Sequence, residues 1–330
     1  MKSRQDELQD WLINTLKLNI QAFDKLAGDA SFRHYYRIQA HFPEKQLQSY
    51  IAMDSPPTHE KNQEFVTINH LLNQKKVRVP QIHAINLHKG FMLLEDFGNL
   101  HFFEILTPEN KARYYQKAVD VIHQIQAPLS AETIKQLPAF SKDYMREELT
   151  LFEEWFLKAH LSIELNDLEI KLIHQCFDYL VNAIDKHPKT LIHRDFHSRN
   201  LMILSDDSIG VIDFQDAMIG PRSYDLVSLL KDCYIAHTEA FQVLGLKKFK
   251  AHDIIVFQQE YHLCGLQRHL KVLGIFSRLY HRDGKSRYLA DLPLVLDYTF
   301  KGLDHIPELS TFHHWLKKRV LKAFQQKVGS

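Results

Sequence analysis

The chain has 330 residues, which is enough for about two domains with cores of their own. Hydrophobic residues make up 45% and charged residues 25%, and the 11 glycines and 11 prolines are too few for a collagen-like or low-complexity chain. Lys and Arg total 41 against 40 Asp and Glu, so the net charge of +1 lacks the strong basic field typical of nucleic-acid-binding proteins. We expect a globular protein with no nucleic-acid partner.

The sequence carries no signal for export or membrane insertion. Residues 1–11 are rich in charged side chains and hold no apolar run that could be the core of a signal peptide. No run of about 18 apolar residues occurs in the sequence. The three cysteines are far apart and odd in number, which argues against a disulfide framework and favours buried, reduced thiols. We expect a cytoplasmic protein with no membrane partner, and we take it to be a monomer.

The first hundred residues predict an opening helix and a small sheet. Apolar residues at helical spacing indicate an amphipathic helix over residues 6–18. One further helix is expected at about residues 63–72. Five β-rich runs lie at residues 22–26, 32–38, 49–53, 81–85 and 90–98. Five strands and one intervening helix favour a small α+β lobe with an antiparallel sheet.

After Gly98 the pattern becomes mainly helical. Apolar residues recur every three or four positions in residues 111–125, 143–160 and 168–184, and again from Tyr224 to the end. Between residues 190 and 227 the helical pattern stops, and three short apolar runs predict a strand and a hairpin. The sequence therefore predicts an α+β protein with two lobes, residues 1–98 and residues 99–330.

This strand and hairpin region carries three polar side chains at a spacing typical of phosphoryl transfer. Asp195 and Asn200 match the Asp and the Asn of H-R-D-x-x-x-x-N, and Asp213 begins an Asp-Phe pair at the end of the next strand. In kinases the first Asp orients and deprotonates a hydroxyl, and the Asn and second Asp hold Mg²⁺ on the phosphates. We expect Asp195 to be catalytic, Asn200 and Asp213 to be metal ligands, and ATP and Mg²⁺ to be the cofactors.

Two histidines flank this catalytic aspartate. His193 and His197 are four apart, as in some zinc sites, but they bracket a loop rather than lie on a helix, and Arg194 between them would repel a dication. We expect His193 to be structural and His197 to lie near the acceptor hydroxyl. Asp195 taken alone would more often be a turn or cap residue, so only its combination with Asn200 and Asp213 indicates a kinase.

Over nearly its whole length the sequence resembles the aminoglycoside phosphotransferase family, the small-molecule branch of the protein-kinase-like fold. The resemblance lies in residues 28–37, 53–57, 93–98, 193–202, 212–234 and 266–279. It implies a bilobal protein-kinase-like fold with a small β-rich nucleotide-binding lobe and hinge at residues 1–98. The larger, mainly helical lobe at residues 99–330 would be catalytic and bind the substrate.

Residues 212–234 and 266–279 are the specific parts of this resemblance. They are similar to members of the family that phosphorylate N-acetylated amino sugars. The resemblance therefore implies ATP-dependent phosphorylation of the anomeric hydroxyl of N-acetylmuramate or N-acetylglucosamine in cell-wall recycling. It leaves open which sugar is preferred.

The resemblance also assigns nucleotide-binding positions. The turn that would cover the phosphates is Gly28, Asp29, Ala30 and Ser31, and it has one glycine where kinases have three. Glu95 and Phe97 fall in the hinge, where backbone groups would bind adenine. Asp225 would brace the catalytic loop.

The lysine that kinases carry on the third strand is absent. The corresponding run, residues 51–54, reads Ile-Ala-Met-Asp, so Glu64, a candidate for the helix acid, lacks a cationic partner there. Arg33 and Arg37 share one face of the second strand by alternation, and either could neutralise phosphate instead. The alternative is that both are surface arginines.

The charge of the C-terminal part bears on the acceptor. Residues 227–330 hold 16 Lys and Arg against 9 Asp and Glu, which disfavours a polycationic aminoglycoside and suits a neutral or anionic sugar. Arg268, with its neighbours His269 and Lys271, is a candidate for contacting a carboxylate, unless this helix face is simply solvated. Gln215 and Asp216 are candidates for binding the acetamide.

Three other functions stay open. Another small-molecule kinase of the same family would share every core motif. The missing lysine is compatible with a nucleotide-binding pseudokinase. A protein kinase is less favoured, because Asp225 lies only twelve positions after Asp213 and no A-P-E segment lies between them.

Overall fold

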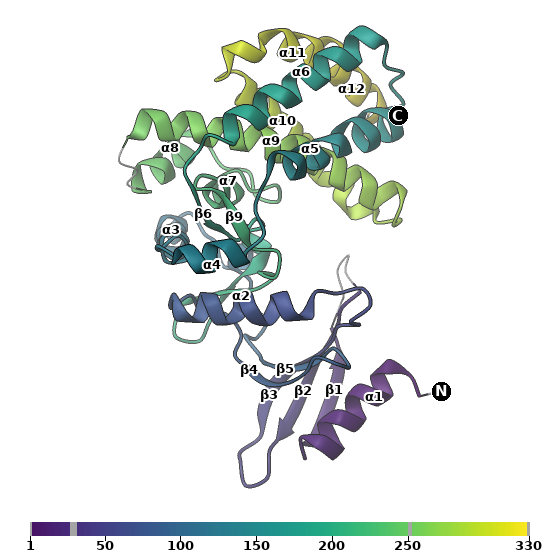
Figure 1. Ribbon diagram of the computed structural model, residues 1–330, viewed down its shortest axis with the longest axis vertical. Coiled ribbons are helices and arrows are strands. Elements are labelled where there is room, and N and C mark those ends of the chain that lie inside the picture. Colours follow the sequence, from purple (N-terminus) through teal and green to yellow (C-terminus); the bar gives the residue numbers. More distant parts are fainter. Residues whose placement is uncertain (1, 27–31, 250–252, 329–330) are drawn as a thin grey trace. The chain divides into compact units, whose positions relative to one another are not determined.

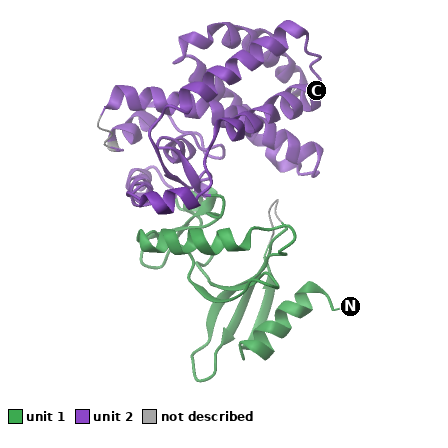
Figure 2. Cartoon of the chain, in the orientation of Figure 1, with its two compact units in different colours: residues 1–105, 199–216 green, residues 106–198, 217–330 purple. Residues whose placement is uncertain are grey.

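The computed structural model describes residues 2–26, 32–249 and 253–328 (Figure 1). The chain forms two compact units (Figure 2). Unit 1 consists of Met1–Ile105 and Arg199–Asp216, and unit 2 of Leu106–Ser198 and Ala217–Ser330. These units differ from the expected division after Gly98, because the first extends to Ile105 and also includes a later hairpin.

Unit 1 is built on a five-stranded antiparallel sheet in the order β1-β2-β3-β5-β4. Its strands are β1 (Asn19–Lys25), β2 (His34–His41), β3 (Gln48–Asp54), β4 (Ile82–Asn86) and β5 (Phe91–Glu95). Helix α2 (Asn62–Gln74) connects β3 to β4. The five strands and the helix that the sequence predicts are therefore confirmed, with ends shifted by a few residues.

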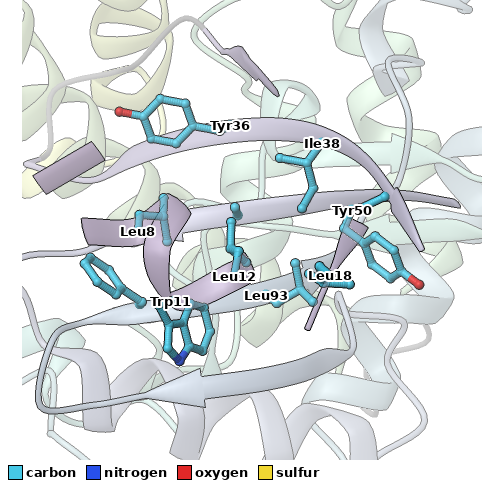
Figure 3. Packing of buried hydrophobic residues seen from close by; sticks show 11 residues of the cluster. Leu8, Trp11, Leu12, Leu18, Tyr36, Ile38, Tyr50 and Leu93 are labelled. Atoms are coloured by element: carbon cyan, nitrogen blue, oxygen red, sulfur yellow. The ribbon is translucent and has the colours of Figure 1, made fainter. Parts of the chain in front are cut away.

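The N-terminal helix covers one face of this sheet. Ser3 caps α1 (Arg4–Asp10), and the helical path continues through η1 (Trp11–Thr15). Leu8, Trp11 and Leu12 pack against Tyr36 and Ile38 of β2 (Figure 3). Because strand side chains alternate between faces, the odd-numbered neighbours in β2 point to the opposite face. This face carries Arg37.

A hairpin distant in sequence completes unit 1. It consists of β7 (Leu201–Ile203) and β8 (Ile209–Val211). The N–H of Val211 donates to the carbonyl of Arg78 at 2.8 Å, and His101, just before η2 (Phe102–Glu104), bridges Met202. These backbone contacts attach the hairpin to residues more than a hundred positions earlier, which explains why division by sequence position did not assign it.

Unit 2 is mainly helical and also holds one two-stranded sheet, β6 (Lys189–Ile192) with β9 (Met218–Pro221). Its longer helical segments are α3 (Lys111–Ile125), α5 (Lys142–Leu151), η3 (Phe152–His160), α6 (Asp167–Ile184), α8 (Glu239–Lys248), α9 (Ile254–His281) and α10 (Leu292–Leu303). The shorter ones are α4 (Ala131–Gln136), η4 (Ser198–Asn200), which crosses into unit 1, α7 (Tyr224–Leu230), η5 (Ser286–Asp291), η6 (Pro307–Leu309), α11 (Ser310–Trp315), η7 (Leu316–Leu321) and α12 (Lys322–Val328). Within the described ranges, no helix is long and apolar enough to cross a membrane.

Helix α9 lies at the centre of unit 2. Most of its side chains are buried, including the charged Arg268 and Lys271. At Gly274 an added Cβ would lie 2.3 Å from the carbonyl carbon of Leu151, so α9 and the end of α5 approach more closely than any larger residue allows. This packing holds the polar stretch Gln267–Lys271 in the interior of unit 2.

Candidate active site

The loop that follows β6 is held by a buried carboxylate. Asp225, in the first turn of α7, accepts the backbone N–H of His193 at 2.8 Å and that of Arg194 at 3.0 Å. The hydroxyl of Ser228 donates to the carbonyl of Arg194, whose φ of +76° is a left-handed conformation. Asp225 thus makes the bracing contacts that the resemblance implies, and the buried His193 is part of the same framework.

Asp195 lies in this loop among positive charges. Burial alone would raise the pKa of Asp195, but the charges of Lys271, Arg194 and neighbouring cations outweigh it and hold that pKa well below its usual range. The carboxylate therefore stays ionised at neutral pH. The N–H of His197 donates to the carbonyl of Asp195, and the His197 ring packs edge-on against Tyr234.

A buried acid that the sequence argument did not single out organises these cations. Glu148 on α5 accepts from Arg194 Nη2 at 2.8 Å and from Gln267 Nε2 at 3.0 Å, and lies 3.2 Å from Lys271 Nζ. The sequence does hold one signal for a buried role of Glu148: residues 145, 148, 149 and 152 share one helix face, and the other three are apolar. Glu148 therefore links the loop that carries Arg194 and Asp195 to α9.

The expected metal ligands lie at the ends of the β7–β8 hairpin in unit 1. Asn200 Nδ2 is 3.4 Å from Asp213 Oδ2, and the N–H of Ile212 donates to the carbonyl of Asn200. Asp213 has a φ of +61°, which turns the chain sharply after the hairpin. A carboxylate and an amide at this separation offer the hard oxygen donors that Mg²⁺ binds, so the residues fit this ion.

The two candidates for acetamide binding differ in their surroundings. Gln215 donates from Nε2 to Asp213 Oδ1 at 2.8 Å, whereas Asp216 is exposed. In this structure the Gln215 side chain therefore holds the carboxylate of Asp213, which is an expected metal ligand. Its contact with an acceptor stays a prediction, as does that of Asp216.

Arg33 forms an ion pair with an acid, as the lysine that is missing from the third strand does in kinases. It lies just before β2 and is buried, with Nη2 3.0 Å from Glu60 Oε2. Its guanidinium lies 5.8 Å from the centre of the Phe65 ring. The acid is therefore Glu60, which precedes α2, rather than Glu64 within it, and the alternative of a surface arginine is wrong for Arg33.

Arg37 has a different role. Its guanidinium pairs with Asp96 at 2.7 Å and donates to the carbonyl of Gly98 at 2.8 Å. The same carboxylate accepts from the hydroxyl of Ser49 and from the N–H of Gly98. These contacts tie Arg37 to the hinge segment, which argues against its use as a phosphate-binding residue.

The hinge residues are themselves well held. The backbone N–H of Glu95 donates to Gln81, and its carboxylate pairs with Arg78. The Phe97 ring lies 5.0 Å from the Arg78 guanidinium, and a Cβ at Gly210 would lie 2.6 Å from that ring. Phe97 thus packs onto the hairpin through a glycine, while the Glu95 N–H is already used within the sheet.

The remaining predicted residues are those of the phosphate-covering turn and those of α9. Gly28, Asp29, Ala30 and Ser31 lie outside the described residues. Arg268 is only 2% exposed and donates from Nη1 to the sulfur of Cys233 at 3.2 Å, and His269 is buried against Tyr298. The alternative of a solvated face for this part of α9 is therefore wrong.

Known proteins are similar to this chain in sequence over most of its length. An N-acetylmuramate/N-acetylglucosamine kinase of Pseudomonas putida is 36% identical over 295 residues, covering 86% of this chain and 84% of that protein. A protein of the same name from Neisseria meningitidis serogroup B is 35% identical over 329 residues and covers 96% of each chain.

A solved structure and a family model extend these similarities. An ADP-bound aminoglycoside phosphotransferase is similar with a TM-score of 0.61 at 15% identity, covering 88% of this chain and 97% of that one, which confirms the expected α+β kinase-like fold. The model described as the phosphotransferase enzyme family matches residues 23–250. With the spacing of Asp195, Asn200 and Asp213, this match shows that the chain belongs to the phosphotransferase enzyme family.

Proposed function

We propose that this phosphotransferase transfers the γ-phosphoryl group of ATP to the anomeric hydroxyl of N-acetylmuramate or N-acetylglucosamine, giving the sugar 1-phosphate in cytoplasmic cell-wall recycling. The observation that carries the proposal is the H-R-D loop braced by Asp225, in which Asp195 lies beside Arg194 and is followed by Asn200 at the kinase spacing. The names of relatives at 35% and 36% identity support the choice of acceptor.

The residues take distinct roles in this reaction. Asp195 orients the sugar hydroxyl and accepts its proton as the oxygen attacks the γ-phosphorus in line. Asn200 and Asp213 would hold Mg²⁺, which when bound offsets the negative charge of the phosphate oxygens. Positioning and electrostatics supply most of the rate in such transfers, so a rigid loop is what the chain must provide.

The buried cations argue against a polycationic acceptor. Arg268 and Lys271 both contribute positive charge at Asp195, on the side of the loop where α9 packs. An aminoglycoside would bring further positive charge toward them, whereas a neutral or anionic sugar would not. This favours the sugar kinase over an antibiotic kinase.

The direct test is ADP release with each acceptor. We expect turnover with N-acetylmuramate, N-acetylglucosamine or both, a 1-phosphate product by ³¹P NMR, and none with an aminoglycoside. Nucleotide binding without ADP release from any acceptor would support the pseudokinase alternative. Phosphorylation at another hydroxyl would contradict the anomeric assignment.

We infer that Arg33 contacts the nucleotide phosphates while Glu60 fixes its position. Hydrogen bonds to charged groups contribute about 1.5–3 kcal/mol, so Arg33→Ala should raise KM for ATP about 10- to 100-fold. The KM for ATP of Arg33→Lys should lie between those of the wild type and Arg33→Ala. An unchanged KM in a folded Arg33→Ala variant would assign the pair a purely structural role.

The pH dependence of kcat should follow Asp225. Burial raises the pKa of this carboxyl to about 6, and its protonation removes an acceptor from the N–H groups of His193 and Arg194. We therefore expect kcat to fall as the pH drops through about 6, whereas Asp195 stays ionised. If the pH at which kcat falls changes when ATP is replaced by its γ-thio analogue, the titrating group is on the nucleotide and not Asp225.

The stability of the fold should not decrease with kcat as the pH falls through about 6. Because the folded chain holds the Asp225 proton more tightly than the unfolded chain, whose value is near 3.8, this group contributes increasing stability as the pH falls from about 6 toward 3.8. The melting temperature near pH 5.5 should thus reveal no loss caused by Asp225.

A further inference from the structure

Arg268 is a buried cation at the centre of α9. In the parts of the chain that the structure describes, it forms no ion pair, and its buried Nε has no hydrogen-bond partner. Its Nη1 donates to the sulfur of Cys233, but burial raises the pKa of that thiol, so the sulfur stays neutral. By contrast, Lys271 and Arg194 share the carboxylate of Glu148. Among the described residues, the only hydrogen bond of this buried guanidinium is to a weak sulfur acceptor, and the charge of Asp195 acts on it without an ion pair.

Contacts within unit 2 connect Arg268 to the catalytic loop. Its partner Cys233 directly follows Asp232, whose carboxylate accepts the backbone N–H of Ser198 at 2.8 Å, at the end of that loop. The positive charge of Arg268 also acts on Asp195. Arg268 and Asp195 therefore share one electrostatic environment, so a negative group on an acceptor held by Asp195 would be attracted toward Arg268.

We propose that Arg268 binds the carboxylate of the acceptor sugar and so makes the enzyme favour N-acetylmuramate over N-acetylglucosamine. This rests on the proposed function. The two sugars differ by a lactyl ether on C3, which carries a carboxylate and is separated from the anomeric carbon by one ring carbon. A guanidinium can bind a carboxylate through two parallel hydrogen bonds, which the neutral sulfur of Cys233 cannot match.

The kinetic test compares the two sugars in Arg268→Lys and Arg268→Gln. We expect kcat/KM for N-acetylmuramate to fall about 10- to 100-fold, while that for N-acetylglucosamine changes less than about twofold. Arg282→Gln is the matched control, because Arg282 follows the same helix, is exposed and pairs with Asp283. Equal losses for both sugars, or no loss for either, would overturn the proposal.

A second measurement does not depend on the variants folding. Wild-type enzyme should use N-acetylmuramate about tenfold better than its carboxyl amide, which keeps the shape and removes the charge. Equal use of the acid and the amide would overturn the proposal. If wild type phosphorylates neither sugar, the proposed function fails, and calorimetric binding of the acid and the amide then tests Arg268 by itself: tighter binding of the acid supports it, and equal binding overturns it.

Discussion

Replacing Asp195 by asparagine is expected to lower kcat about 10²- to 10⁴-fold, which is the usual contribution of a positioned acid or base. Asparagine keeps the size of the side chain but cannot accept the proton of the sugar hydroxyl. An anomeric hydroxyl is more acidic than an ordinary alcohol, so the loss should lie toward the lower end of that range. The measurement is kcat from ADP release, with KM for ATP recorded alongside.

The Asp195 variant also needs a control for folding. Because the neighbouring cations lower the pKa of this carboxyl in the folded chain, its charge stabilises the fold above pH 3.8, and the asparagine variant should melt somewhat earlier. Activity is therefore compared well below the melting temperature. The control is Asp297→Asn, whose carboxylate pairs with Lys301 on an exposed helix face. Wild-type turnover in a folded Asp195→Asn variant would reject the scheme.

The elements of the fold were predictable because their signals are local. Runs rich in β-forming residues predict the strands of the sheet, and helical spacing predicts α2, α3, α5, α6 and a helical C-terminal part. The membership of the β7–β8 hairpin was not predictable, because it depends on the bond from Val211 to Arg78, far away in the sequence. Register and pairing between distant segments leave no comparable pattern in a single sequence.

The candidate site also contains residues that the sequence predicts and residues that it does not. The loop spacing from Asp195 to Asn200 is a local pattern, and Asp225 follows from the family resemblance. Glu60 is not predictable from the kinase pattern, because that pattern places the acid within α2, whereas Arg33 pairs with a residue that precedes this helix. The contacts of Glu148 with α9 were equally invisible, since they join residues more than a hundred positions apart.

Glu148→Gln should destabilise the protein by about 3–5 kcal/mol, because removing one partner of a buried ion pair leaves its cations uncompensated. Here two cations, Arg194 and Lys271, depend on the same carboxylate. A loss of this size is a large part of the about 5–15 kcal/mol that stabilises a typical domain. The measurement is the free energy of unfolding from a urea titration.

The matched control for Glu148 is Asp178→Asn. Asp178 pairs with Arg146 at the surface, where such pairs contribute about 0–1 kcal/mol, so its loss should be hardly measurable. Since Glu148 also holds Arg194, the residue before Asp195, its glutamine variant should lose kcat even at temperatures where it remains folded. Equal unfolding free energies for the two variants would mean that Glu148 does not organise the buried cations around the catalytic loop.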